Sequence, residues 1–328
     1  MNRNDEARDI QLRFEREGDA VGQPDPYVLE ELEILHRTAG NEARAEYYAN
    51  RKSSTAYMMR DSDKGFVGSI PEIYEHHLVP LIFESYAADL VRRVALLAPA
   101  RVLEIAAGTG VVTRGLASSL PEDVAIVATD LNQPMLDLAD AIGTPRPVQW
   151  RVADALNLPF ADGAFDVVVC QFGVMFFPDK PRALAQARRV LRPGGTLLFN
   201  VWDRIEENEF ADVVTRALGV VFPDDPPRFM ARTPHGYHDL RDIGRDLAAG
   251  GFTAAPRFET VTRRSLAESP RIVAVAYCQG TPLRNEIDAR DPARLDEATE
   301  VSAEAIAQRF GRGAVDGKIQ AHVVTIQN

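Results

Sequence analysis

Cysteine is scarce in this chain of 328 residues, which contains only Cys170 and Cys278. Cys170 lies in an apolar run typical of a buried strand and Cys278 in an expected helix, so neither predicts a disulfide framework or a metal site. Apolar runs approaching the ~20 residues of a membrane-spanning helix are also lacking. Since the charged residues 1–6 do not resemble a signal peptide, we expect a cytoplasmic protein.

Positive charge is scarce as well. The chain contains 37 Lys and Arg residues and 48 Asp and Glu residues, which gives a formal net charge of -11. Nucleic-acid binding depends on cationic contacts to phosphates. We therefore expect neither a nucleic acid nor an anionic membrane as a partner. With 45% hydrophobic residues, the chain is long enough to bury a full core, which predicts one catalytic domain with appendages.

The most informative stretch is residues 102–110, where an apolar strand containing Glu104 runs into the turn Ala106-Ala107-Gly108-Thr109-Gly110. Glycine lets the backbone turn sharply and lets a ligand approach the peptide groups closely. Apolar residues at helical spacing follow the turn. This order of strand, turn and helix start predicts a nucleotide-type cofactor site.

The nature of that cofactor follows from a missing glycine and from an acid. Dinucleotide-binding turns carry three glycines spaced G-x-G-x-x-G, whereas Thr113 stands at the third position here. A carboxylate at Glu104 would repel a pyrophosphate at short range. It suits instead the ammonium of S-adenosylmethionine (SAM), which has no phosphate.

A second strand, residues 125–130, ends in Asp130, about 20 residues beyond the glycine turn. At this spacing an acid accepts hydrogen bonds from the 2′ and 3′ hydroxyls of a ribose. Taken alone, Asp130 would more often be a helix N-cap, with Pro134 shortly after it. In register with the first motif, the ribose interpretation is favoured.

Three more strands complete the pattern. Residues 148–152 lead to Asp154-Ala155, residues 165–170 lead to Gln171-Phe172, and residues 196–201 follow the helix-stopping run 191–195. Strands and helices thus alternate five times, which predicts a parallel sheet with helices on both faces. Ligands then bind at the carboxyl ends of the strands.

With these motifs, residues 69–251 resemble the class I SAM-dependent methyltransferases, in particular those built like the ubiquinone and menaquinone biosynthesis methyltransferases. The resemblance implies an α/β fold with a Rossmann-like, seven-stranded, mostly parallel sheet that ends in an antiparallel C-terminal hairpin. It also implies a methyltransferase domain over residues 69–328, with a helical lid inserted at about 203–235. Residues 319–326 are the expected closing strand.

The resemblance also assigns roles around SAM. Leu131 and Met135 would flank the adenosine, the Asp154-Ala155 pair would meet the adenine, and Gln171 and Phe172 would line the methyl-transfer site. Ser69 to Glu72 reads as a capping box that starts a helix ending at Pro80, from which Tyr74 would face the methionine end. The full set of expected cofactor residues is Tyr74, Glu104, Ala106, Gly108, Thr109, Gly110, Asp130, Leu131, Met135, Asp154, Ala155, Gln171 and Phe172.

Histidines are the candidates for a general base, because their side chains titrate near neutral pH. The pool is His76, His77, His235 and His238. For the last two, capping or surface roles are the favoured interpretation. No spacing among these residues predicts a metal site.

Residues 1–68 lie outside the resemblance. Their polar first part is expected to be mobile at its tip, and Asp25-Pro26 opens a predicted helix towards Tyr48. We interpret them as a helical extension that packs on the core or on a second subunit, in which case it forms a homodimer.

The leading hypothesis is a SAM-dependent methyltransferase that acts on an oxygen, nitrogen or carbon atom of a small molecule by in-line displacement. None of the cofactor motifs performs chemistry, so a non-catalytic SAM-binding module is one alternative. An NAD-dependent oxidoreductase, which shares the strand, turn and acid, is the other.

Overall fold

The computed structural model describes residues 65–328 and, before them, Leu32, His36, Arg37, Glu42, Arg44, Ala45, Tyr47 and Asp63. The chain divides into two units, Met1–Met59 and Arg60–Asn328. Most of the predicted N-terminal extension lies outside the described residues, although the residues described between Leu32 and Tyr47, where a helix is expected from Asp25, are helical. The structure of the rest of the extension and its dimer contact stay predictions.

One sheet of seven strands forms the centre of the second unit. Its strand order is β3-β2-β1-β4-β5-β7-β6, in which β1 to β5 run parallel and β7 pairs antiparallel with both β5 and β6. The bounds are β1 Arg101–Ile105, β2 Ala125–Asp130, β3 Gln149–Val152, β4 Phe165–Gln171, β5 Leu191–Trp202, β6 Arg257–Ala267 and β7 Val315–Gln327. The predicted mostly parallel sheet with an antiparallel C-terminal pair is confirmed.

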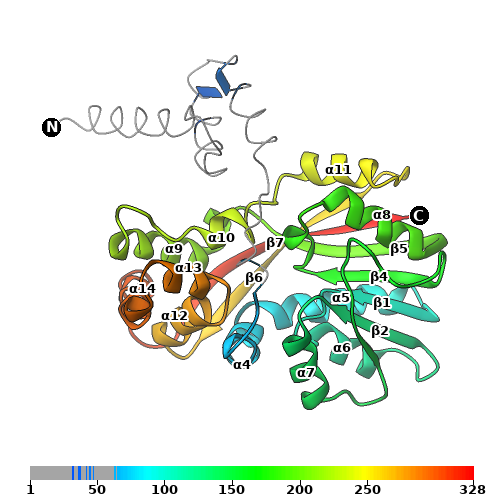
Figure 1. Cartoon of the computed structure of the whole chain (residues 1–328), viewed down its shortest axis with the longest axis horizontal. Helices are drawn as coiled ribbons and strands as arrows, with labels where there is room; N and C mark the ends of the chain where they lie inside the picture. Colours follow the sequence, from blue (N-terminus) through cyan, green and yellow to red (C-terminus); the bar gives the residue numbers. More distant parts are fainter. Residues whose placement is uncertain are drawn as a thin grey trace. The chain divides into compact units, whose positions relative to one another are not determined.

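Helices cover both faces of the sheet, as predicted (Figure 1). On one face lie α5 (Glu84–Leu96), α6 (Val111–Ser119) and α7 (Gln133–Ile142), and on the other lie α8 (Lys180–Val190) and α11 (Leu240–Ala249). The prediction that strands and helices alternate regularly was wrong at one point, because β3 and β4 are joined without a helix.

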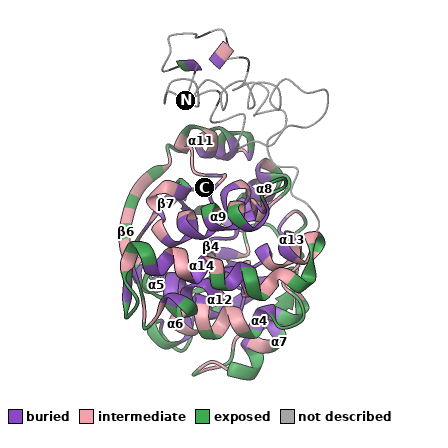
Figure 2. Cartoon of the chain, turned by 90° about the vertical axis from the view of Figure 1, so that its left-hand side faces the viewer, coloured by how far each residue is buried: buried purple, intermediate pink, exposed green. Residues whose placement is uncertain are grey.

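The core between α5, α6 and the sheet is apolar. Leu90 and Val94 of α5 and Leu116 of α6 are fully buried against Val102 of β1 and Val169 of β4. Figure 2 shows the central strand β4 buried, whereas the edge strand β6 and the outer helix surfaces are largely exposed or half-exposed. Burial of such side chains stabilises by about 2 kcal/mol each, which holds β1 and β4 at the centre of the sheet, where the strand order reverses.

Two insertions add helices beside the sheet. Between β5 and α11 lie η4 (Ile205–Glu207), α9 (Glu209–Val221) and α10 (Phe229–Arg232). Between β6 and β7 lie α12 (Pro270–Gln279), α13 (Leu283–Arg290), η5 (Pro292–Arg294) and α14 (Leu295–Phe310). Since α14 packs on both α9 and α12, the two insertions form one helical layer (Figure 1).

The helix before β1 differs from its prediction. A short α4 (Ile70–Ile73) continues through the π-helix η2 (Tyr74–Phe83) directly into α5, so the helix does not end at Pro80 as predicted. Proline lacks an N–H and crowds the carbonyl four residues earlier, a conflict that the wider π turn avoids. The capping box does not form either, because Ser69 makes no side-chain cap and its hydroxyl accepts a hydrogen bond from Arg284 instead.

Within the part of the chain that the structure describes, no helix has both the length and the apolar character that crossing a bilayer requires.

Candidate functional site

The turn after β1 has the backbone geometry that its glycines predict. Gly108 and Gly110 have φ values of 57° and 84°, and α6 begins directly after them. A Cβ at Gly110 would also lie 2.9 Å from the indole ring of Trp150, too close for any side chain. At Gly108 the nearest atoms would be 3.6 Å away, in Met135 and Tyr74. Gly110 therefore shapes the turn, whereas Gly108 keeps the space in front of it open.

Asp130 fastens this turn to the end of β2. Its Oδ2 accepts a hydrogen bond from the backbone N–H of Gly108 (2.9 Å), and its Oδ1 accepts one from the N–H of Asn132 (2.8 Å). Burial raises the pKa of Asp130, although these two hydrogen bonds oppose the rise. The side-chain amide of Asn132 also donates to Oδ1 (3.3 Å). A carboxylate has about four acceptor sites, so capacity for one ribose hydroxyl is left.

Glu104 is 1% exposed, on the central strand β1. The hydroxyl of Thr113, the residue at the place of the third glycine, donates to its Oε2 (2.5 Å). Burial raises the pKa of Glu104 to about 8, against the effect of this hydrogen bond. Without a ligand the group is thus mostly neutral at pH 7, which corrects our repulsion argument. A buried acid of this kind favours a cation because an ion pair offsets the cost of its ionisation.

A cavity opens at the carboxyl ends of β1, β2 and β4. It is lined by all of the expected cofactor residues except Glu104, Thr109 and Gly110. Ala106 and Phe172, at the ends of β1 and β4, line it with φ values of 56° and 50°. Non-glycine residues rarely adopt this left-handed conformation, and such strain concentrates at binding sites.

The remaining candidates lie close by. Asp154 lines the cavity, and its Oδ1 accepts a hydrogen bond from the N–H of Leu156, so it also holds a turn. Thr109 is buried, and its hydroxyl has no partner among the described residues. Burial and the nearby Asp130 raise the pKa of Tyr74, whose hydroxyl therefore stays protonated.

An aromatic belt lies around the cavity, and apart from Tyr74 and Phe172 its members were not predicted from the sequence. Neighbouring ring centroids lie 6.2 Å apart for Phe229 and Phe176, 6.1 Å for Phe176 and Phe66, and 6.0 Å for Phe66 and Tyr74. The belt continues through Phe83 and Phe172 to Trp202, where the last two rings stack at 3.7 Å. These rings come from separate segments, so no periodicity in the sequence could have grouped them.

The π-helix is tied to the glycine turn by a charge pair. Arg114 of α6 donates to the backbone oxygen of Thr109 (2.6 Å) and to Glu75 of η2 (2.6 Å). Neither residue was predicted, although an acid beside Tyr74 and a base in the first turn of α6 were visible signals. The pair holds Tyr74 over the site.

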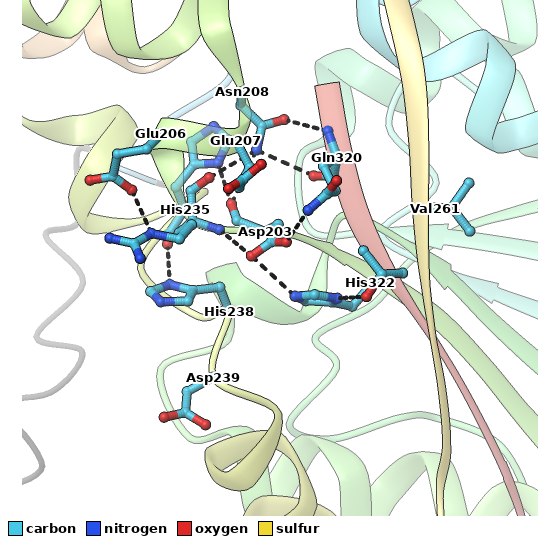
Figure 3. A network of polar contacts seen from close by, with 12 residues as sticks. Asp203, Glu206, Glu207, Asn208, His235, His238, Asp239, Val261, Gln320 and His322 are labelled. Atoms are coloured by element: carbon cyan, nitrogen blue, oxygen red, sulfur yellow. Dashed lines mark hydrogen bonds and ion pairs between the residues drawn. The ribbon is translucent and has the colours of Figure 1, made fainter. Parts of the chain in front are cut away.

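The structure does not bring the candidate histidines to the cavity: among the described residues that line it there is no histidine. His76 is exposed and His77 half-exposed. His235 is buried, donates from Nδ1 to the backbone oxygen of Asp203 (2.9 Å), and has a pKa lowered by burial to about 4. His238 donates from Nδ1 to the backbone oxygen of His235 (Figure 3).

Figure 3 shows that this network fastens the start of the insertion between β5 and α11 to β7. The Nε2 of His322 lies 3.2 Å from Asp203, and Gln320 donates to the same carboxylate (2.7 Å). Although burial acts in the opposite direction, these hydrogen bonds hold the pKa of Asp203 below its usual value. In the described part of the chain, no cluster of His, Cys, Asp and Glu is arranged to hold a metal ion.

Comparison with known proteins agrees with this geometry. A family model described as "Methyltransferase domain" matches residues 103–199. A demethylmenaquinone methyltransferase of Corynebacterium urealyticum is 32% identical over 170 residues, covering 49% of this chain and 71% of that protein. The chain belongs to the class I SAM-dependent methyltransferases. This membership, with SAM as the cofactor, sets aside the dinucleotide-binding alternative.

Other relatives of this methyltransferase align over different shares of their length. The ubiquinone/menaquinone biosynthesis C-methyltransferase UbiE of Paraburkholderia phymatum is 37% identical over 168 residues, 47% of this chain and 68% of that protein. Its counterpart in Dinoroseobacter shibae is 42% identical over 102 residues, 30% of this chain and 40% of that protein. The chain thus spans less than half the length of some relatives it matches.

Proposed function

We propose that this methyltransferase moves a methyl group from SAM to an uncharged small molecule by in-line displacement. The observation that carries the proposal is a cavity at the carboxyl ends of the strands, where Asp130, Gly108 and Asp154 meet the aromatic belt. A hydrogen-bonding end and an apolar end share this one cavity, as a cofactor and its acceptor require.

The residues fit SAM. Gly108 leaves open space in front of the turn, Asp130 has acceptor capacity for a ribose, and the hydroxyl of Thr109 has no partner among the described residues. Glu104 is buried beside the turn, where an ammonium would draw it into its charged form. We assign the thirteen expected cofactor residues to this role on these grounds.

The chemistry needs little from the side chains. SAM supplies a methyl group already activated on positive sulfur. The chain holds the acceptor in line, and its aromatic belt excludes water and offers electron-rich ring faces to a cation. Because no histidine of the described part lines the cavity, we propose that positioning dominates and that no side chain takes the proton of the acceptor, which reaches the bulk solvent as the product leaves the site.

The names of the relatives suggest the first acceptor to test, the ring carbon of a quinone precursor. The family model, however, ends at residue 199. The lid and the β6–β7 insertion, which supply Phe229 and Tyr277 to the cavity, follow that residue. We therefore infer the class of acceptor from the residues that line the cavity, and not from the names of the relatives.

The test combines binding and turnover. Calorimetry with S-adenosylhomocysteine should give a saturable isotherm, and SAM labelled in its methyl group should pass the label to a reduced naphthoquinone. Binding without transfer to any acceptor would support the non-catalytic module instead. Absence of binding at millimolar ligand would refute both.

We further propose a cytoplasmic location, no nucleic-acid partner in view of the net charge of -11, and a homodimer through residues 1–68. Analytical ultracentrifugation of the full chain tests the last of these. A monomer at micromolar concentration would contradict it.

A further inference from the structure

Part of the wall of the cavity is built by the β6–β7 insertion, which supplies Tyr277, Thr281 and Pro282. Strands β6 and β7 pair directly, yet α12, α13 and α14 lie between them in the chain. Helix α12 packs against η2, and a Cβ at Gly280, just after α12, would lie 3.3 Å from the backbone nitrogen of Tyr74. This close approach places the end of α12 directly beside the segment that covers the cofactor site.

We name this side of the cavity the acceptor wall and define it by its lining residues, which are Phe66, Phe176, Trp202, Phe229, Met230, Pro234, Tyr277, Thr281 and Pro282. None of these described residues carries a charge. The charged residues of the lining, Asp130 and Asp154, lie at the ends of β2 and β3. Because an unpaired charge is costly to bury, the wall favours an uncharged, flat, apolar molecule.

The two side-chain hydroxyl groups of this wall differ in their partners. The hydroxyl of Thr281 is used, because it donates to the backbone oxygen of Tyr277 (2.7 Å). Tyr277 is 2% exposed, and its own hydroxyl makes no hydrogen bond with any residue the structure describes. Burial alone raises the pKa of Tyr277, so no charged group acts on it and the hydroxyl stays a donor.

We propose that Tyr277 positions the acceptor, by donating a hydrogen bond from its hydroxyl to an oxygen of an uncharged aromatic molecule held against the acceptor wall. This inference rests on the proposed function and adds to it the chemical class of the acceptor and the residue that orients it. In the transfer, the bond between methyl and sulfur breaks and a bond from methyl to an acceptor carbon or oxygen forms. S-Adenosylhomocysteine leaves, and the proton displaced from the acceptor passes to water.

Three probes separate the contributions to binding. Calorimetry with the full chain saturated with S-adenosylhomocysteine compares 1-naphthol, which is flat and carries an oxygen, with naphthalene, which lacks the oxygen, and with 1-naphthoate, which is charged. The wild-type protein should bind 1-naphthol at least about tenfold more tightly than either of the others. Naphthalene lacks the oxygen that accepts the hydrogen bond, and 1-naphthoate would bury an unpaired charge.

The variant Tyr277→Phe keeps the ring and removes the hydroxyl. It should weaken 1-naphthol binding about tenfold and leave the affinity for naphthalene and for S-adenosylhomocysteine unchanged. A structural role would instead lower both aromatic affinities together. The matched control is Tyr237→Phe, since Tyr237 is equally buried but its hydroxyl donates to Asp246 away from the cavity lining. This control should change none of the relative affinities.

The outcomes distinguish this inference from the proposed function. If S-adenosylhomocysteine does not bind, the proposed function fails. If it binds while 1-naphthol does not, or while 1-naphthoate binds as tightly, the uncharged acceptor class is wrong. If Tyr277→Phe lowers the affinity for naphthalene and for 1-naphthol equally, or lowers neither affinity, the positioning role of Tyr277 is overturned.

Discussion

Replacing Glu104 with glutamine should stabilise the ligand-free protein at the cost of cofactor binding. Glu104 is 1% exposed, and the Thr113 hydroxyl donates to it. Burial raises its pKa from 4.5 to about 8. Glutamine has the shape of the protonated acid but never ionises, so Glu104→Gln removes the cost of charging this position.

The sign follows from the two pKa values. Because the folded-state pKa lies above the unfolded value, the stabilising contribution of the protonated acid is complete below pH 4.5 and is lost as the pH rises through about 8. At about 1.4 kcal/mol for each pH unit, the free energy of unfolding falls by at most about 5 kcal/mol across this window. Relaxation and water penetration make the measured value smaller.

Thermal unfolding of both proteins at several pH values from 5 to 8, without ligand, measures the effect. The melting temperatures should lie close together at pH 5 and diverge as the pH rises, with Glu104→Gln the more stable protein at pH 8. Calorimetry at pH 7 should show S-adenosylhomocysteine binding to the wild type with proton release, because the ammonium draws Glu104 into its charged form. The variant should bind at least about tenfold more weakly.

Glu122→Gln is the control, because Glu122 is exposed and its substitution should not change the pH profile. Parallel melting curves for the wild type and Glu104→Gln from pH 5 to 8 would refute the reasoning. Unchanged cofactor affinity in Glu104→Gln would show that the buried acid does not serve the ammonium.

Asp130→Ala should weaken S-adenosylhomocysteine binding by about 1 to 3 kcal/mol, because the ribose and the N–H of Gly108 both lose an acceptor; calorimetry showing unchanged affinity would mean that the ribose acid is misassigned. Gly110→Ala should destabilise the fold by about 1 to 3 kcal/mol, because φ is 84° and an indole ring lies 2.9 Å from the added Cβ; Gly313→Ala, in open space, is the control in urea unfolding. Arg232→Met should lower the free energy of unfolding by about 3 to 5 kcal/mol in the same assay, because the buried carboxylates of Asp63 and Glu286 each lose an ion pair with Arg232. A decrease smaller than that caused by substituting an exposed arginine would contradict this account.

Local patterns in the sequence were enough for the cofactor side of the fold. Gly110 requires a positive φ, Asp130 ends an apolar run, and the closing strand at 319–326 is mostly buried within β7. Each of these features depends on a few neighbouring residues, so it is visible without the rest of the chain. The path through Pro80 was predicted wrongly, because a proline normally ends a helix and a π turn that tolerates it depends on packing against α12.

The acceptor side depended on contacts between distant segments. Phe66, Trp202, Phe229 and Tyr277 line one cavity although they come from four separate parts of the chain. Helical periodicity around Tyr277 predicts a buried residue equally well for a core position and for a cavity wall.

The sequence by itself determined the parallel sheet, the glycine turn and the acid that follows it, because short-range backbone and pairing rules govern all three. Only the tertiary structure decided which rings surround the cavity, that the histidines lie elsewhere, and that burial raises the pKa of Glu104 to about 8. Burial and cross-chain packing set those properties, and neither is encoded in any single segment.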